Sequence, residues 1–190
     1  MHWLTDYLFL ALWAVFLVYW QVMAAGAKAT RRLEPVGSRI SRMILFFAAI
    51  VLLMDQRIPL PFLYWHFLPL GYGPFFAGAA ITVAGLLFAV WARVHLGSNW
   101  SRSVTIKEGH ELIRTGPYAL VRHPIYTGLL AGFLGSALAT IEVRGLLALA
   151  LIFSALWAKL SMEERWMREQ FGASYETYSQ HVAALVPFVL

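Results

Sequence analysis

Residues 116–128 read GPYALVRHPIYTG, and the interpretation of the whole chain starts from this stretch. It places polar, aromatic and helix-starting residues directly before an apolar run from Ile125 to Ile141. Proline is common at the first position of a helix, so Pro124 predicts a helix that begins there. A polar cluster at the start of an apolar helix indicates a functional site at a membrane surface.

The composition is that of an integral membrane protein. Of the 190 residues, 60% are hydrophobic and 13% are charged, and the mean hydropathy is +0.65. Soluble domains have about half apolar and about a quarter charged residues. A chain of this length suits one domain, and about four to six spans of about 20 residues would use most of it. The absence of cysteine excludes disulfides, thiolate nucleophiles and cysteine metal sites.

Five apolar stretches predict an all-α integral membrane bundle of about five transmembrane helices in a single domain. They lie at about residues 3–25, 41–58, 74–94, 124–141 and 145–162. Only a tight turn separates the last two, so they should form an antiparallel hairpin. We expect a polar loop at about residues 97–123, and an amphipathic cytoplasmic helix and tail over residues 163–190.

The basic residues predict the orientation of the chain. With five spans, the loop after the first span, the loop after the third span and the C-terminus share one side. That side holds all of the 15 Lys and Arg residues except Arg57 and Arg144. Loops rich in Lys and Arg stay in the cytoplasm, so we expect a multi-pass protein of the cell inner membrane with a cytoplasmic C-terminus. The net charge of +5 then follows from topology, and no motif supports nucleic-acid binding.

Small residues recur every four positions in the fourth span, at Gly128, Gly132, Ser136 and Thr140. Such a stripe lets another helix approach closely. We expect it to pack within a monomer. A dimer through the Gly128/Gly132 face is the alternative.

Charged residues cluster at the predicted cytoplasmic ends of the fourth and fifth spans. Arg122 and His123 stand directly before the fourth helix, whose free N–H groups and positive dipole end attract anions. Lys159 and Glu163 are four residues apart and project from one helix face. Charges within a membrane usually line a cavity or pair with one another. Two interpretations stay open: a ligand site, or a surface anchor beside a self-satisfied ion pair.

Motifs of soluble cofactor-binding proteins are absent. The sequence has no G-x-G-x-x-G, no phosphate loop and no H-E-x-x-H. Its histidines never fall four residues apart on one helix, so we expect no metal site. Alternating strands and helices are also missing, which excludes a Rossmann fold and makes any cofactor pocket a non-Rossmann one.

Several short motifs follow one another between Leu96 and Leu190. They are Gly-x-Tyr at 116–118, Arg-His-Pro-x-Tyr-x-Gly at 122–128, a helical hairpin, Glu163-Glu164, Phe-Gly-x-x-Tyr-x-x-Tyr at 171–178, and Pro187. In this order and spacing they resemble the membrane-embedded isoprenylcysteine carboxyl methyltransferase family and its bacterial and archaeal relatives. The resemblance covers roughly half of the chain. The first two spans are generic.

The resemblance implies S-adenosylmethionine as methyl donor, held at the cytoplasmic membrane surface, and a lipophilic methyl acceptor. When the family's donor contacts are carried over by position, the residues that would bind the donor are Ser103, His110, Glu111, Leu112, Ile113, Tyr118, His123, Pro124, Ile125, Tyr126 and Glu163. The tyrosine rings suit adenine or a sulfonium, and the glutamate suits the donor's amino group. Lys159 and Arg122 would be the catalytic residues.

Lys159 departs from the family pattern, because members often carry an arginine at this position. Arginine binds a carboxylate through a planar fork, whereas lysine offers a point charge, so the acceptor can differ from the family's best-known substrate. We expect carboxyl O-methylation of an isoprenylcysteine-like acceptor. The alternatives are a small-thiol S-methyltransferase, a phospholipid N-methyltransferase that would need Glu164 or His181 as a base, and a non-catalytic membrane assembly or transport module.

Reporter fusions at Leu70 and Leu190 test the predicted orientation. Leu70 lies between the second and third predicted spans, and Leu190 follows the fifth. The two positions should lie on opposite sides of the membrane. Alkaline phosphatase should therefore be active at Leu70 and inactive at Leu190, and a fluorescent protein should show the reverse. Equal signals at both positions would contradict the five-span arrangement.

Overall fold

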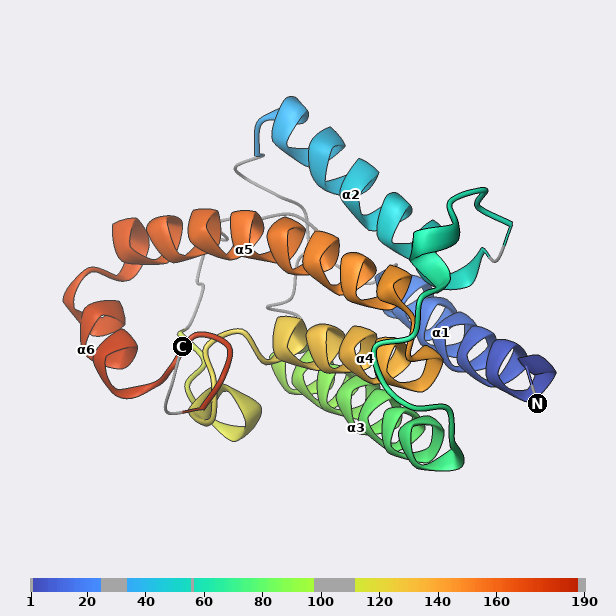
Figure 1. Cartoon of the computed structure of the whole chain (residues 1–190). Helices are drawn as coiled ribbons and strands as arrows, with labels where there is room; N and C mark the ends of the chain where they lie inside the picture. The colour runs from blue at the N-terminus through green and yellow to red at the C-terminus, as the bar shows by residue number, and fades with distance from the viewer. Residues whose placement is uncertain (1, 25–33, 56, 98–111, 188–190) are drawn as a thin grey trace.

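The structure, a computed structural model, describes residues 2–24, 34–55, 57–97 and 112–187. Within these ranges the chain is helical, and its only extended pairing is one isolated bridge between His66 and Glu142. The helices are α1 (His2–Ala24), α2 (Val36–Met54), α3 (Tyr72–Leu96), α4 (Pro124–Thr140), α5 (Val143–Phe171) and α6 (Ala173–His181), with 3-10 turns η1 (Pro61–Tyr64) and η3 (Gly116–Ala119). Figure 1 shows α3 and α4 side by side and α5 alongside α4, while α2 meets α5 near one end and diverges from it toward the other.

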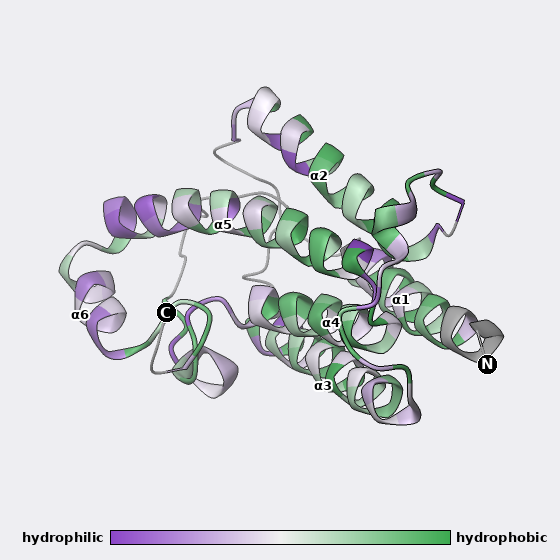
Figure 2. Ribbon diagram, viewed as in Figure 1, coloured by the Kyte–Doolittle hydropathy of each residue, from purple (hydrophilic) through white to green (hydrophobic). Residues whose placement is uncertain are grey.

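The bundle confirms the predicted all-α integral membrane class. Three helices, α2, α3 and α5, are long and apolar enough to cross a bilayer. The apolar helical segments Tyr7–Met23 and Pro124–Thr140 are shorter, at the lower limit of about 17 residues for a span. Figure 2 shows hydrophobic residues along these helices and hydrophilic residues gathered on α6 and the end of α5. Hydrophobic and hydrophilic regions are thus separated along the bundle.

The boundaries of α2 differ from those of the predicted span at residues 41–58. The helix begins at Val36, directly after Pro35, and it ends at Met54. Asp55 has an extended backbone, which stops the helix. The prediction started too late because the charged residues of the first turns looked like loop. Those turns are in fact helical.

The end of α5 also differs from the predicted span, which stopped at residue 162 and was followed by a separate helix and tail. The helix continues to Phe171 and stops at Gly172, whose φ of +49° lies in the left-handed region that favours glycine. The polar residues in between are good helix formers, so nothing ends the helix earlier. Glu163 and Glu164 are therefore held on a rigid helix.

Contacts at the two ends of the bundle show that α2 to α5 alternate in direction. At one end the connection between α2 and α3 meets the turn between α4 and α5, where Phe67 N–H donates to Ile141 O at 3.0 Å. At the other end the segment before α4 meets the C-terminal segment, where Arg122 N–H donates to Ala183 O at 2.9 Å. This alternation agrees with the predicted five-span arrangement.

The start of α5 is fixed to two neighbouring helices. A Cβ atom on Gly145 would lie 2.8 Å from Ala137 Cα of α4, so only glycine fits there. Arg144 Nη1 donates to Asp55 O at 3.2 Å and to carbonyls of the last turn of α2. These carbonyls have no partner within their own helix. The buried guanidinium also pairs with Glu142, whose Oε2 lies 2.5 Å from its Nε.

Facing glycines bring α3 and α4 into close contact. A Cβ atom on Gly128 would lie 2.5 Å from Gly85 O, and one on Gly135 would lie 2.5 Å from Gly78 O. Real Cβ atoms essentially never come this close to backbone, so the approach depends on glycine. The small-residue stripe predicted for the fourth span therefore packs within the chain.

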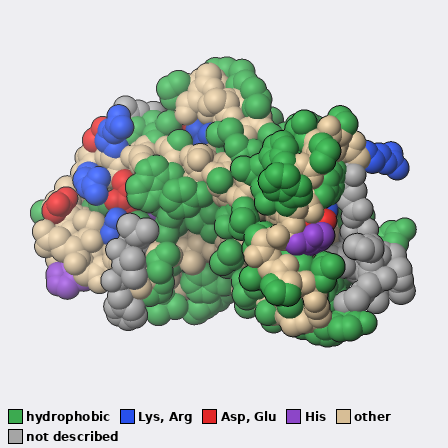
Figure 3. Space-filling model, viewed as in Figure 1, with side chains coloured by type: hydrophobic (Ala, Val, Ile, Leu, Met, Phe, Trp, Pro, Cys, Tyr) green, Lys and Arg blue, Asp and Glu red, His purple; other side chains and the backbone are tan. Residues whose placement is uncertain are grey.

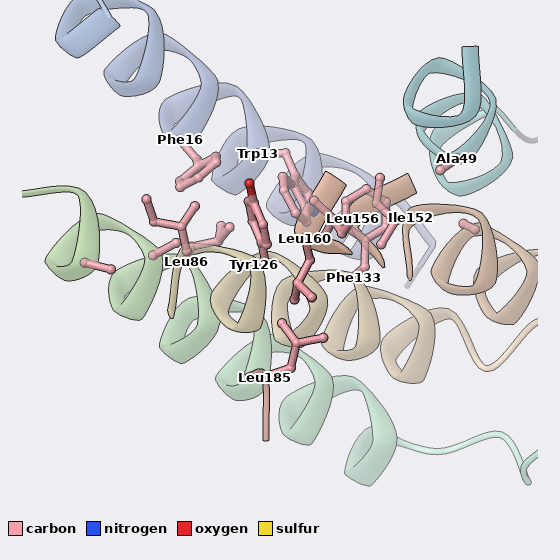
Figure 4. Packing of buried hydrophobic residues seen from close by; sticks show 14 of the residues in the cluster. Trp13, Phe16, Ala49, Leu86, Tyr126, Phe133, Ile152, Leu156, Leu160 and Leu185 are labelled. Carbon is pink, nitrogen blue, oxygen red and sulfur yellow. The ribbon is translucent and has the colours of Figure 1, made fainter. Parts of the chain in front are cut away.

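Trp13 of α1 covers Gly132 and Ser136 of that stripe. A Cβ atom on Gly132 would lie 3.2 Å from the Trp13 ring, and Trp13 Nε1 donates to Ser136 Oγ at 3.1 Å. Figure 4 shows Trp13 and Phe133 within the packed centre of the bundle, where their ring centroids are 4.7 Å apart. The Gly128/Gly132 face is occupied by α3 and α1, so it cannot also serve as the dimer contact that was the alternative.

Gly128→Ala should lower the thermal stability of the detergent-solubilised protein. The added Cβ would press against backbone atoms of α3, which cannot move independently of their helix. Overpacking of this kind typically costs about 1–3 kcal/mol. Unfolding followed by tryptophan fluorescence should show a lower midpoint. The matched control is Gly37→Ala in α2, where a Cβ meets nothing within 4 Å and alanine favours the helix. A wild-type midpoint for Gly128→Ala would rule out the close α3–α4 contact.

Candidate functional site

The turn that leads into α4 is shaped by one glycine and two prolines. Gly116 has a φ of +59°, and a Cβ there would lie 2.8 Å from the His95 ring, so both the conformation and the space require glycine. Pro117 is the second residue of η3 and Pro124 is the first of α4, at positions where a helix needs no N–H. The turn directs Tyr118 inward, where it is 8% exposed.

The carboxylate of Glu164 is the centre of a hydrogen-bond cluster. Its Oε1 accepts from Arg122 Nε at 2.8 Å, from His123 Nε2 at 2.9 Å and from Tyr175 OH at 2.8 Å. Its Oε2 accepts from Arg168 Nη2 at 3.1 Å. A carboxylate offers about four lone-pair sites. Glu164 is therefore saturated, and its role is to hold its neighbours in place.

Arg122 ties the C-terminal segment to the turn before α4. Its guanidinium donates to Ser179 O at 3.0 Å and to Val182 O, and its backbone N–H donates to Ala183 O at 2.9 Å. The N–H of the next residue donates to Ala184 O at 3.0 Å. These two backbone N–H groups are occupied, so they are not available to the anionic ligand expected at the helix start.

Gly172 turns the chain back so that two tyrosines of α6 reach the cluster. Tyr175 donates to Glu164, and Tyr178 OH donates to Tyr118 O at 2.5 Å. Burial raises the pKa of both phenols, that of Tyr178 to about 12, so both remain neutral donors at physiological pH. The Phe-Gly-x-x-Tyr-x-x-Tyr motif thus fastens α6 against the site.

Glu163 has a different environment from its neighbour. Its Oε1 accepts from Tyr126 OH at 2.7 Å and lies 3.7 Å from Lys159 Nζ, while its Oε2 lies 3.5 Å from His123 Nδ1. Only the first of these contacts has the length of a good hydrogen bond. Glu163 therefore keeps lone pairs for another donor, which Glu164 does not.

His123 bridges the two glutamates. One ring nitrogen contacts Glu164 and the other faces Glu163, and the ring stacks on Tyr126 with a centroid distance of 5.4 Å. A carboxylate can only accept, so this placement favours the imidazolium form, in which both ring nitrogens carry hydrogen. Burial lowers the pKa of His123, but the hydrogen bonds and charges of both glutamates outweigh it and raise the pKa above its usual value.

A cavity of about 780 Å³ lies beside this cluster. One end is polar and is lined by His123, Tyr126, Lys159 and Glu163, whereas Glu164 does not line it. The remainder is mainly apolar and is enclosed largely by side chains of α1, α2, α4 and α5. Figure 4 shows Tyr126 pointing from α4 toward the side of α1 that carries Phe16 and other large apolar residues. The cavity therefore suits ligands with a charged part and a long apolar part.

Most of the predicted site residues meet at this cavity. Those that line it are Leu112, Ile113, Tyr118, Arg122, His123, Pro124, Ile125, Tyr126, Lys159 and Glu163. Ser103, His110 and Glu111 lie outside the described residues. Across the described ranges, no group of three His, Asp or Glu side chains is placed to hold a metal ion.

The sequence interpretation missed the contribution of the first two helices, which it treated as generic. Arg42 of α2 and Glu34 just before it form a buried ion pair in the cavity wall. Trp13 and Phe16 of α1 line the apolar part. The available signal was a charged residue within an apolar helix, which is rarely without a role. The predicted span at residues 41–58 contained Arg42, but the residue was counted only among the basic residues that orient the chain.

A family model and several known proteins match this chain. A model of the phospholipid methyltransferase family matches residues 74–174, which carry α3, α4 and α5. Protein-S-isoprenylcysteine O-methyltransferase B of Arabidopsis thaliana is 28% identical over 115 residues, which cover 59% of this chain and 58% of that protein. Methanethiol S-methyltransferase 1 of Bradyrhizobium diazoefficiens is 29% identical over 196 residues, which cover 94% of this chain and 66% of that protein. The chain thus spans less than two thirds of the length of either relative.

A solved structure shares the fold. The eukaryotic intramembrane Ras methyltransferase named isoprenylcysteine carboxyl methyltransferase aligns with a TM-score of 0.53 and 22% identity, over 80% of this chain and 51% of that chain. The predicted resemblance is therefore confirmed at the level of family and fold. Because the family model covers more than half of the sequence, the chain belongs to the phospholipid methyltransferase family.

Proposed function

We propose that this protein transfers a methyl group from S-adenosylmethionine to a lipophilic acceptor that carries a carboxylate. An isoprenylcysteine-like acceptor agrees best with the relatives, since the Arabidopsis relative is named for that reaction. The observation that carries the proposal is the Glu163 carboxylate, which has one good hydrogen bond and retains lone pairs, at the polar end of a mainly apolar cavity. The cavity thus provides a binding site for a cationic ligand next to an apolar site for a lipophilic one.

The polar end of the cavity fits the methyl donor. The donor's amino group is a cation, and the lone pairs that Glu163 retains would bind it. The rings of Tyr118 and Tyr126 suit the adenine or the sulfonium. Leu112, Ile113, Pro124 and Ile125 would complete the surroundings of the donor. When bound, S-adenosylmethionine supplies a methyl group on a positively charged sulfur.

Lys159 is placed to bind the acceptor. Its Nζ lies 3.7 Å from the nearest oxygen of Glu163 and 5.4 Å from the ring centre of Tyr126, so its present contacts are loose. A carboxylate of the acceptor would find a cation here beside the donor. An ionised carboxylate needs no general base, so the chain's contribution is positioning and exclusion of water.

Arg122 has a positioning role in this proposal, although the resemblance made it a candidate catalytic residue. Its guanidinium holds Glu164 and the carbonyls of the C-terminal segment. Glu164 in turn holds the ring of His123. Arg122 therefore acts on the ligand through two other side chains.

We place the site at the cytoplasmic face of the cell inner membrane. Among the described residues, Arg39, Arg42, Arg122 and Lys159 line the cavity, and regions rich in Lys and Arg remain in the cytoplasm. Figure 3 shows charged side chains gathered around α6, next to a largely hydrophobic middle of the molecule. The hydrophilic donor would then enter from the cytosol and the acceptor from the bilayer.

A small-thiol S-methyltransferase is the second candidate. The methanethiol methyltransferase relative aligns with 94% of this chain, including the first two helices. A cavity of about 780 Å³ is much larger than a small thiol requires, so its size favours the lipophilic acceptor. Phospholipid N-methylation has less support, because it needs a base and neither candidate suits that role. Glu164 is saturated, and the exposed side chain of His181 is hydrogen-bonded to Thr177 O. Donor binding would separate all of these from a non-catalytic module.

His123→Ala and Glu163→Gln should each weaken S-adenosylmethionine binding. The first removes the imidazolium that orients Glu163, and the second removes the charge that pairs with the donor's amino group. A hydrogen bond to a charged group contributes about 1.5–3 kcal/mol, which corresponds to roughly 10- to 150-fold in affinity. Calorimetric titration of the purified variants measures this change.

Glu176→Gln is the matched control for this titration. It makes the same substitution on α6, where the side chain is 57% exposed and has only a 3.7 Å contact with Arg168. Its donor affinity and thermal midpoint should equal those of the wild type. If the His123 and Glu163 variants fold and bind the donor as tightly as this control, the assigned donor pocket is wrong.

Lys159→Met should lower the methyl-transfer rate while changing donor affinity little, because it removes the charge at similar length. Lys159→Arg should improve transfer to a carboxylate acceptor, since the planar fork fits it. Rates with a prenylcysteine analogue, phosphatidylethanolamine and methanethiol measure both effects. Lost donor binding with normal turnover at saturating donor would place Lys159 in the donor pocket instead. If neither variant changes donor binding or methyl transfer, Lys159 is only a surface anchor.

A further inference from the structure

A second pair of buried charges lies in the cavity wall, on the side of α2. Glu34 and Arg42 both line the cavity, and their side chains are 4% and 10% exposed. Arg42 Nη2 donates to Glu34 Oε1, and Arg42 Nη1 donates to Ser38 Oγ at 3.0 Å. The pair is thereby fixed to the first turns of α2.

One oxygen of this pair has no donor. Glu34 Oε2 is buried and, among the residues that the structure describes, has no hydrogen-bond partner. Helix capping does not account for it, since Pro35 is the N-cap of α2 and no side chain caps that end. A buried carboxylate oxygen that has lost its hydration without gaining a donor is unfavourable. A ligand in the cavity that donates a hydrogen bond would remove this penalty.

The pair shares the cavity with the polar cluster described above. Arg42 and Tyr126 both line this cavity. Phe46 and Met43 of the same helix also line the cavity, so the pair is a polar spot on an apolar wall. A ligand that fills the cavity contacts both this wall and the wall that carries Lys159.

We propose that Glu34 accepts a hydrogen bond from an N–H group of the acceptor, close to the group that is methylated. This inference rests on the proposed function and specifies the class of acceptor: a lipid-tailed molecule whose polar head carries an N–H donor. Two sources supply that chemistry, the amide of an acylated amino acid and the ammonium of a phospholipid headgroup. Because Arg42 already balances the charge of Glu34, the site favours the neutral amide.

Two matched pairs of amphiphiles test the inference by binding alone. The first is N-acetyl-S-farnesylcysteine against S-farnesyl-3-mercaptopropionate, which keeps the tail and the carboxylate but lacks the amide. The second is lysophosphatidylethanolamine against lysophosphatidylcholine of the same tail, in which methyl groups replace the ammonium hydrogens. Each is titrated into the full chain in nanodiscs with S-adenosylhomocysteine present, so that no turnover occurs.

The wild type should bind the amide-bearing farnesyl compound roughly 10-fold or more tightly than its partner. Glu34→Met, which removes the acceptor oxygen, should abolish that difference, and Glu34→Gln, which keeps an oxygen, should retain most of it. A difference confined to the lysophospholipids and lost in Glu34→Gln would make the source an ammonium. Unchanged affinity for S-adenosylhomocysteine shows that each variant is folded.

Equal affinities within both pairs for the wild type would overturn the inference, even if the Glu34 variants failed to fold. Discrimination that persists in a folded Glu34→Met would overturn it as well. The proposed function is tested separately, by transfer of a labelled methyl group to N-acetyl-S-farnesylcysteine. Amide discrimination that depends on Glu34 without any transfer would reject the proposed function and leave the binding role of Glu34 standing.

Discussion

The site depends on the complete satisfaction of one buried carboxylate. Glu164 receives donors from the turn before α4, from α5 itself and from α6, so three separate segments meet at one side chain. A charge buried in this way is stable only with all its partners, and removing any one would leave the others misplaced. The position of His123, and through it that of Glu163, follows from this saturation.

Two adjacent glutamates therefore carry different functions because of helix geometry. Neighbouring residues on an α-helix point about 100° apart, so Glu163 reaches the cavity while Glu164 turns to the C-terminal segment. The first keeps lone pairs for a ligand, and the second has none left. The Glu-Glu motif thus places a ligand-binding carboxylate and a structural carboxylate in two consecutive residues. The same separation explains why Tyr175 of α6 donates to Glu164 and not to Glu163.

Much of this arrangement could be predicted from the sequence. The proline and glycine at the ends of α4 and α5, the apolar runs and the four-residue stripe depend on local rules, and the helices follow them. The grouping of His123, Tyr126, Lys159 and Glu163 came from the family motifs. The role of Arg122 was not accessible, because its partners lie about sixty residues away in the C-terminal segment. The Glu34–Arg42 pair was hidden for a similar reason, since no short motif marks a cavity wall shared by separate helices.

The anchored start of α5 has a consequence for how this family can vary in length. Gly145 fits against α4 at one end of the helix, and Glu163 faces the cavity near the other end. The two positions are 163 − 145 = 18 residues apart, which is five full turns at about 3.6 residues per turn, so they lie on one side of the helix. Inserting or deleting a single residue between them would rotate everything beyond it by about 100° and shift it by about 1.5 Å along the axis. Glu163 would leave the cavity while Gly145 stayed against α4. The number of residues between Gly145 and Glu163 on α5 is thus fixed by the direction in which Glu163 must point. Insertions can be accommodated in the loops instead.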